Sequence, residues 1–261
     1  MTRYALFFDI DGTLVSFKTH QIPPSAIFAL TQAKANGHRI YIATGRPRTI
    51  ITNLGAIQHL IDGYLTTNGA HCFVGDKVVC MNPIRPADVD LILGDCQSND
   101  YSCIVASETE FVVFNPHECV DRIFRRQLAV EQLDMQRPVD KALQQPILQL
   151  SPFFDEAHER ELMSHVPGCV SGRWHPEFTD ITSREADKGI GLRAIAAHEG
   201  FAIEHTIAFG DGGNDATMIR AAGIGIAMGN ALDSLKQQAD YTTTSVDDDG
   251  IRTALRHFGI I

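Results

Sequence analysis

The chain has 261 residues, 44% of them hydrophobic, which is enough to bury one large core or two smaller ones. Its formal net charge of −10 argues against nucleic acid as a partner, because the phosphate backbone selects basic surfaces. The six cysteines are scattered without a CxxC pair, and the first apolar run stops at Asp9, so we expect free thiols, no membrane span and a cytoplasmic protein.

Strands and helices alternate in the pattern of the first third of the chain. Residues 4–8 predict a buried strand, and a helix then opens at a proline pair and ends before Gly37. Residues 39–43 predict a second strand, a helix is expected after Pro47, and residues 63–66 predict a third strand. This alternation is typical of a parallel sheet with right-handed crossovers.

The same pattern returns in the last third. Helices are predicted at 188–199 and 215–222, and strands at 206–209 and 224–228. Both ends of the chain therefore predict parts of one doubly wound, Rossmann-like α/β domain.

The middle of the chain has a different, α+β pattern. The elements predicted there are antiparallel strands at 101–106 and 110–114, helices at 119–130 and 155–165, and strands at 147–150 and 169–174. We therefore predict a core domain made of residues 1–80 and 183–261, with a second domain, residues 81–182, inserted into it.

Two aspartates follow the first strand, in the segment Asp9-Ile10-Asp11-Gly12-Thr13. An Asp-Gly turn of a β-hairpin is the simplest interpretation of this segment alone. However, a proline pair and a helix follow it, and no partner strand does. Ligands of open α/β sheets bind at the carboxyl ends of the strands, so we expect Asp9 and Asp11 at a ligand site.

Acidic residues also follow the strand at 206–209, in Gly210-Asp211-Gly212-Gly213-Asn214-Asp215. Asp215 can also cap the next helix, whereas Asp211 lies too early for that role. If the two strands are neighbours, their aspartates converge, and carboxylates about 4 Å apart repel by about 4 kcal/mol at an effective dielectric of 20. Such a cluster needs a cation, and oxygen ligands favour Mg²⁺.

Two further features favour an anionic ligand. Thr44-Gly45-Arg46 ends the second strand, where a hydroxyl and backbone N–H groups can hold phosphate oxygens, although the tripeptide alone is also compatible with an ordinary turn. Lys188 opens a helix behind Asp187. An exposed lysine is commonly just solvated, but a cation is disfavoured at a helix N-terminus unless both face an anion.

Together these segments, in this order, resemble the four motifs of the haloacid dehalogenase-like (HAD) superfamily. The insertion resembles the large α/β cap of that family. The phrases Thr67-Asn68-Gly69-Ala70, Ala227-Met228-Gly229-Asn230-Ala231 and Asp249-Gly250 resemble the Cof-type subgroup of sugar and metabolite phosphatases. The resemblance implies a doubly wound HAD core with an inserted cap domain.

The resemblance also implies the chemistry. Asp9 would be the nucleophile that forms an aspartyl-phosphate intermediate, and Asp11 the general acid and base. Mg²⁺ would be held by Asp9, by the main-chain carbonyl of Asp11 and by Asp211, with support from Asp215. The residues expected to bind the substrate are Thr44, Gly45, Arg46, Lys188 and Asn214.

The sequence therefore predicts a Mg²⁺-dependent phosphatase that acts on a small phosphorylated metabolite, in particular a sugar phosphate. A sugar phosphomutase shares these motifs and stays open; dependence of activity on a bisphosphate primer would reveal it. A dehalogenase normally lacks the second aspartate, and a non-catalytic phosphometabolite-binding protein would need neither Asp9 nor Asp11. The motifs do not indicate which metabolite is bound, which cap residues contact it, or the oligomeric state.

Overall fold

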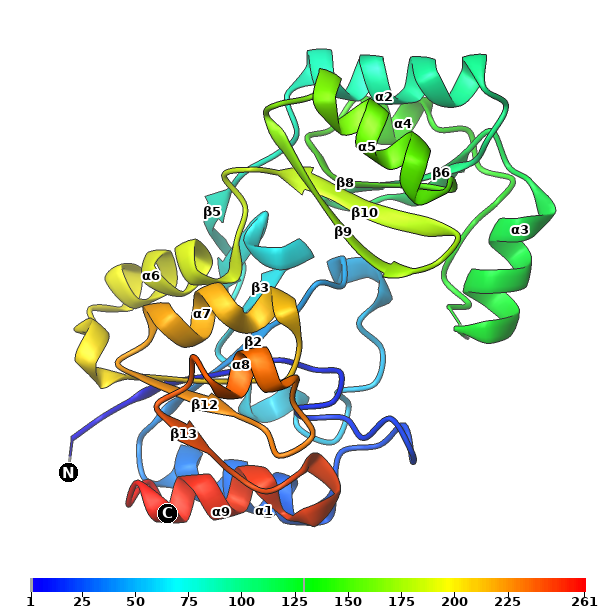
Figure 1. Ribbon diagram of the computed structural model, residues 1–261. Coiled ribbons are helices and arrows are strands. Elements are labelled where there is room, and N and C mark those ends of the chain that lie inside the picture. The colour runs from blue at the N-terminus through cyan, green and yellow to red at the C-terminus, as the bar shows by residue number, and fades with distance from the viewer. Residues whose placement is uncertain (1, 129) are drawn as a thin grey trace. The chain divides into compact units, whose positions relative to one another are not determined.

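The structure is a computed structural model that describes residues 2–128 and 130–261, and it divides into two compact units. Unit 1 comprises Met1–Gly45, Thr52–Met81 and Asp187–Ile261, so both ends of the chain contribute to it (Figure 1). Unit 2 comprises Arg46–Ile51 and Asn82–Ala186. The short segment 46–51 thus joins unit 2, whereas the predicted division placed it in the core domain.

Unit 1 contains an eight-stranded sheet in the order β13-β12-β11-β1-β2-β3-β4-β5. Its strands are β1 (Ala5–Phe8), β2 (Arg39–Ala43), β3 (Gly63–Thr66), β4 (His71–Val74), β5 (Lys77–Met81), β11 (Thr206–Gly210), β12 (Ile224–Ala227) and β13 (Tyr241–Thr242). Strands β13 to β3 run parallel, and β4 and β5 extend the sheet as an antiparallel hairpin that the sequence pattern had not predicted. The α/β fold class is confirmed, with a mainly parallel core sheet.

The central strand β1 is buried on both faces, which explains its continuous apolar run. Phe8 stacks on Phe209 of β11 with ring centroids 4.6 Å apart, and Phe7 stacks on Tyr41 of β2 at 4.8 Å. Each buried aromatic ring stabilises the fold by about 1.5–3 kcal/mol. The order of strands reverses beside β1, which makes its carboxyl end the switch point where ligands bind in such sheets.

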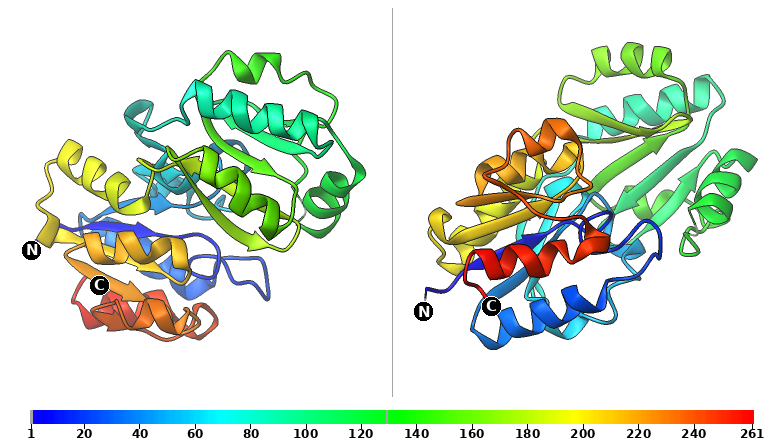
Figure 2. Two further views of the ribbon diagram at one scale, coloured as in Figure 1. Left: turned by 45° about the horizontal axis from the view of Figure 1, so that its top comes forward. Right: turned by 60° about the horizontal axis from the view of Figure 1, so that its bottom comes forward.

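Helices cover both faces of this sheet (Figures 1 and 2). They are α1 (Pro24–Ala35), α6 (Lys188–Glu199), α7 (Ala216–Ala221), α8 (Asp233–Lys236) and α9 (Gly250–His257). Helix α1 packs on α9, and α6 packs on α7. Helix α1 begins with Pro24 in its first turn and ends just before Gly37, whose φ of 90° reverses the chain.

The predicted helix after Pro47 is wrong. The chain forms only two short 3-10 turns there, η1 (Arg48–Ile50) and η2 (Gln58–Leu60). The segment between 49 and 55 is rich in β-branched residues, which lower helix propensity, and it ends at a glycine.

Unit 2 contains helices and a five-stranded antiparallel sheet in the order β7-β6-β8-β10-β9. Its elements are α2 (Pro86–Ser98), β6 (Cys103–Ser107), β7 (Phe111–Phe114), α3 (Glu118–Val120), α4 (Asp140–Leu143), β8 (Ile147–Pro152), α5 (Glu156–His165), β9 (Cys169–His175) and β10 (Phe178–Ser183). Side chains alternate between its two faces, so that Val105 and Leu150 join one apolar cluster while Ile104 and Phe178 join another. Helix α2 and strand β10 were not predicted.

The helix predicted at 119–130 differs in kind. Helix α3 is a single turn, and the chain continues from it as a π-helix, η4 (Asp121–Gln127). Residue 129 of that prediction lies outside the described residues. Across the described chain, no helix combines the length and the hydropathy needed to cross a membrane.

Candidate active site

The predicted acidic residues stand at one edge of the unit 1 sheet. Asp9 follows β1, and β1 pairs with β11 on one side and with β2 on the other. The backbone N–H of Asp9 donates to the carbonyl of Phe209 at 3.1 Å, which continues the ladder to the start of the Asp211 turn. The two acidic strand ends are therefore immediate neighbours.

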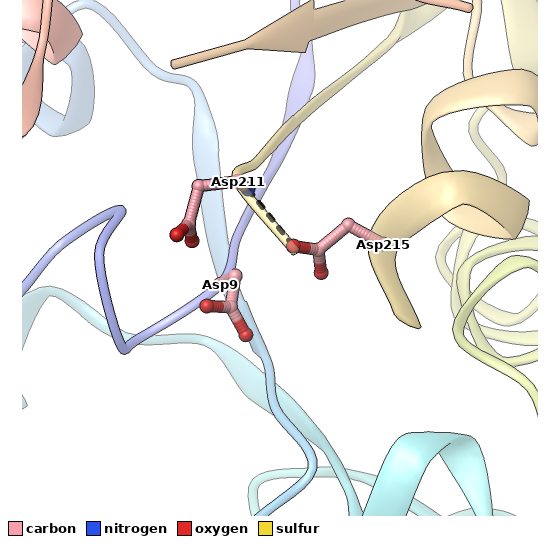
Figure 3. Close-up of side chains that lie close together, drawn as sticks. All are labelled: Asp9, Asp211 and Asp215. Carbon is pink, nitrogen blue, oxygen red and sulfur yellow. Dashed lines mark hydrogen bonds between the residues drawn. The ribbon is translucent and has the colours of Figure 1, made fainter. Parts of the chain in front are cut away.

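Three carboxylates meet at this edge. Ligand oxygens of Asp9, Asp211 and Asp215 lie within 4.8 Å of one another (Figure 3). Asp215 is fully buried and also caps the turn, since its Oδ2 accepts hydrogen bonds from the N–H groups of Asp211 and Gly212, both at 2.9 Å. The Asp11 carboxylate is not part of this cluster.

Lys188 is buried between two of these carboxylates. It is only 1% exposed, and its Nζ donates to Oδ1 of Asp9 and to Oδ1 of Asp215, each at 2.6 Å. Asp187 caps the helix by accepting from the N–H of Ile190 at 2.7 Å, so α6 starts with the lysine aimed into the cluster. The interpretation of Lys188 as a solvated surface residue is excluded.

Burial and mutual repulsion make this cluster electrostatically costly. Burial raises the pKa of Asp9 well above its usual value, Lys188 opposes this, and Asp215 and Asp211 add to it. Burial and the charge of Asp215 raise the pKa of Asp211 to about 7. Burial alone would lower the pKa of Lys188, but Asp215 and Asp9 outweigh it and raise that pKa instead. One ammonium group thus faces three carboxylates, an arrangement that favours a further cation.

The donor set fits a hard divalent cation such as Mg²⁺. Every ligand atom of the cluster is a carboxylate oxygen, and Asp211 is oriented by a hydrogen bond from the Thr13 hydroxyl at 3.0 Å. Gly12 has φ +80°, and a Cβ built there would lie 2.2 Å from Oδ2 of Asp211. The glycine therefore lets the loop after β1 approach this carboxylate closely.

The predicted phosphate-binding residues of unit 1 lie beside the cluster. Thr44 is buried at the end of β2, and its N–H donates to the carbonyl of Leu65 in β3 at 2.8 Å. Asn214 donates from Nδ2 to Oδ1 of Asn68 at 3.0 Å, and both amides lie against Gly45, where a Cβ would come within 3.2–3.5 Å of them. Arg46, the other residue predicted to bind substrate, belongs to unit 2.

Three residues at the site were not assigned from the sequence. Thr13 orients Asp211, as described above, although it lies within the first motif. Asn230 donates from Nδ2 to the carbonyl of Gly12 at 2.8 Å and accepts from the N–H of Val246 at 2.9 Å, which ties the loop after β1 to the C-terminal part of the chain. Asn68 bonds Asn214. The signals were present, because Asn230 and Asn68 stand in two of the Cof-type phrases.

Comparison with known proteins agrees with this geometry. A family model described as haloacid dehalogenase-like hydrolase matches residues 6–255. The chain belongs to the haloacid dehalogenase-like hydrolases. It is a phosphatase of this family, that is, a phosphoric monoester hydrolase, and it has the fold of subclass IIB.

Individual relatives support the same assignment. The solved structure of the HAD subclass IIB sugar phosphatase BT4131 is 45% identical, with a TM-score of 0.90, and the match covers 99% of this chain and 100% of that one. BT1666 from Bacteroides thetaiotaomicron is 32% identical, with a TM-score of 0.88 over 99% of this chain and 96% of that one. The 5-amino-6-(5-phospho-D-ribitylamino)uracil phosphatase YitU of Bacillus subtilis (strain 168) is 26% identical over 268 residues, 98% of this chain and 97% of the relative.

Proposed function

We propose that this phosphatase is Mg²⁺-dependent and hydrolyses a small phosphorylated metabolite, in particular a sugar phosphate, through an aspartyl-phosphate on Asp9. The observation that carries this proposal is the buried Asp9 carboxylate, held by Lys188 within a cluster of three carboxylates. The 45% identity to a sugar phosphatase supports the substrate class.

The residues that would hold the metal are Asp9, Asp211 and the main-chain carbonyl of Asp11. Asp215 supports them, because one of its oxygens accepts from Lys188 while the other fixes the turn that carries Asp211. A bound Mg²⁺ supplies positive charge that neutralises the phosphate dianion and polarises its oxygens.

The chain's own residues then perform two transfers. A carboxylate oxygen of Asp9 forms a bond to phosphorus in line with the breaking ester bond, and Asp11 gives its proton to the departing oxygen. In the second step Asp11 removes a proton from water, whose oxygen attacks phosphorus and releases inorganic phosphate and the free Asp9 carboxylate. Thr44 and Lys188 hold the phosphoryl oxygens in both steps.

We also propose that unit 2 is the cap that selects the leaving group and excludes water during the first step. The predicted division, with residues 1–80 and 183–261 as the core and 81–182 as the cap, differs from these units in the segment 46–51 and by a few positions at the two later boundaries. Removal of unit 2 should then abolish selectivity among phosphorylated metabolites.

The decisive experiment uses Asp11→Asn and p-nitrophenyl phosphate. This ester has a stable leaving group and needs little help from an acid, so the variant should still transfer phosphate to Asp9 and then stall, because nothing activates water. Rapid-quench measurements should show a burst of up to one equivalent of p-nitrophenol per site, and mass spectrometry should locate the phosphate on Asp9.

Asp9→Asn is the matched control, since it changes the neighbouring carboxylate by the same isosteric replacement. It should show no burst, no phosphoenzyme and no turnover. Slow linear hydrolysis by Asp11→Asn without a burst or a trapped phosphate would instead indicate direct attack by water, and Asp9 would then be a metal ligand only.

A further inference from the structure

The turn after β3 is strained and has no role in the reaction as described above. Thr67, Asn68 and Gly69 have successive φ angles of 53°, 53° and 90°. Positive φ is uncommon for any residue except glycine, and for a β-branched threonine it is a genuine outlier. Strain of this kind persists only where the surrounding structure imposes it, and it clusters at functional sites.

Two elements of the active site hold this turn in place. The N–H of Asn68 donates to the carbonyl of Thr44 at 3.0 Å, which fixes the turn to the end of β2. On the other side Gly69 packs on the backbone of Asp187, where a Cβ would lie only 2.3 Å from the carbonyl oxygen. The turn thus contacts Thr44, which is predicted to bind phosphate, on one side and Asp187, which precedes Lys188, on the other.

The side chain of Asn68 meets that of Asn214, from a loop on the far side of two strands. The sheet order β11-β1-β2-β3 separates the loop of Asn214, after β11, from the loop of Asn68, after β3, by three strand spacings of about 4.8 Å. The bond between these two amides therefore spans the ends of β1 and β2, where Asp9 and Thr44 stand. We therefore expect an ester phosphate that Asp9 attacks to lie within reach of these amides.

The hydrogen bond from Asn214 also determines which group of Asn68 is left for a ligand. Because Oδ1 of Asn68 accepts from Asn214, the side chain offers its Nδ2 and two N–H donors, and no partner of Nδ2 is present among residues 2–128 and 130–261. This nitrogen lies next to Gly45, since a Cβ there would be 3.4 Å from it.

A phosphate dianion at this edge of the sheet meets three carboxylates and a lysine that is already paired with two of them. Neutral N–H donors stabilise such an anion without introducing another charge that must be compensated. Resting on the proposed function, we propose that Asn68 is a phosphate-binding residue whose side-chain amide donates to an oxygen of the phosphoryl group.

Asn68→Gly tests this proposal cleanly. Glycine adopts φ 53° without strain, so the variant removes the amide while its thermal midpoint should stay unchanged or rise. We expect kcat/KM for p-nitrophenyl phosphate to fall about 10- to 100-fold, as for one hydrogen bond to a charged group, and the inhibition constant of inorganic phosphate to rise by a similar factor. Asn115→Gly, the same replacement at an asparagine of unit 2 with φ 48°, should change neither value.

A double-mutant cycle with Asn214→Gly separates contact with phosphate from mere support of Asn214. If Asn68 binds phosphate, the double variant should lose at least fivefold more activity than Asn214→Gly alone. Equal activities of the double variant and of Asn214→Gly would overturn the proposal, and so would a fall in kcat/KM of less than twofold in Asn68→Gly. Binding of inorganic phosphate can be followed by calorimetry in Mg²⁺ buffer even if the ester is a poor substrate. The role of Asn68 can therefore be tested, and can fail, independently of the aspartyl-phosphate route.

Discussion

Replacing Lys188 by methionine keeps the length of the side chain and removes the only ammonium group that the described structure places within the carboxylate cluster. Its Nζ lies 2.6 Å from Oδ1 of Asp9 and 2.6 Å from Oδ1 of Asp215, and all three side chains are buried. The substitution therefore perturbs two ion pairs at once, in a place that water does not screen.

The expected loss of stability follows from these distances. Unit charges 2.6 Å apart attract by about 6 kcal/mol at an effective dielectric of 20, but the cost of desolvating the ammonium cancels much of this. Removing one partner of a buried pair typically costs about 3–5 kcal/mol, because the other charge is left uncompensated. We expect a loss in this range, which corresponds to a fall in Tm on the order of 10 °C.

The effect on catalysis should be separable from the effect on folding. If Lys188 also stabilises the phosphoryl oxygens, kcat/KM should fall at least a hundredfold, about 3 kcal/mol of transition-state stabilisation. Adding Asp215→Asn to Lys188→Met removes one of the two stranded charges, so it should restore part of the thermal stability without restoring activity. Steady-state kinetics at a temperature well below both transitions, together with calorimetric melting, measures the two quantities.

Lys34→Met is the matched control. Lys34 also belongs to unit 1 and pairs with Asp62 at 2.5 Å, but Asp62 bonds the N–H of Ile40 at the opposite, amino-terminal edge of the sheet. Its side chain is 30% exposed, so its loss should cost about 1 kcal/mol or less and leave kcat/KM within twofold. A change in kcat/KM of less than threefold in Lys188→Met would refute the assignment of this lysine to the phosphoryl site.

Two further predictions concern the metal and the pH dependence of unit 2. Mg²⁺ should support hydrolysis and Ca²⁺ should inhibit it. Ca²⁺ accepts bidentate carboxylates at about 2.3–2.6 Å, so it would occupy both oxygens of Asp9 and leave neither for attack on phosphorus. Full activity with Ca²⁺ after removal of Mg²⁺ would contradict this prediction. Glu110 accepts from Lys141 at 2.5 Å and Arg137 at 2.7 Å, and these partners lower its pKa from the usual 4.5. Because the folded-state pKa is lowered, the ionised Glu110 contributes stability that is complete above pH 4.5 and is lost as the pH falls through the folded-state pKa. Glu110→Gln should therefore flatten the acid limb of a plot of Tm against pH. An unchanged acid limb would exclude the effect.

Several features were predictable because they depend on residues close together in the chain. Apolar runs that end at Asp9, Thr44 and Asp211 mark buried parallel strands, and the order of the motifs led to the correct family and fold class. Burial of β1 on both faces explains why a short continuous apolar run was a reliable signal.

Local pattern was less informative where the structure departs from regular elements. The segment after Pro47 has apolar residues, but its β-branched residues and Gly55 disfavour a helix, and it forms 3-10 turns. The hairpin of β4 and β5 sits at the edge of the sheet, and its second strand is half-exposed, which hides the periodicity that identifies a buried strand.

The contacts that make the site join residues that are far apart in the sequence. Lys188 and Asp9 are 179 positions apart, and Asn214 and Asn68 are 146 apart. Strand, turn and helix signals are local, so the sequence alone shows which chemical groups stand at the strand ends. Which carboxylates share the lysine, and which amides bond to each other beside them, depends on the tertiary structure, since strand order and loop packing set these distances.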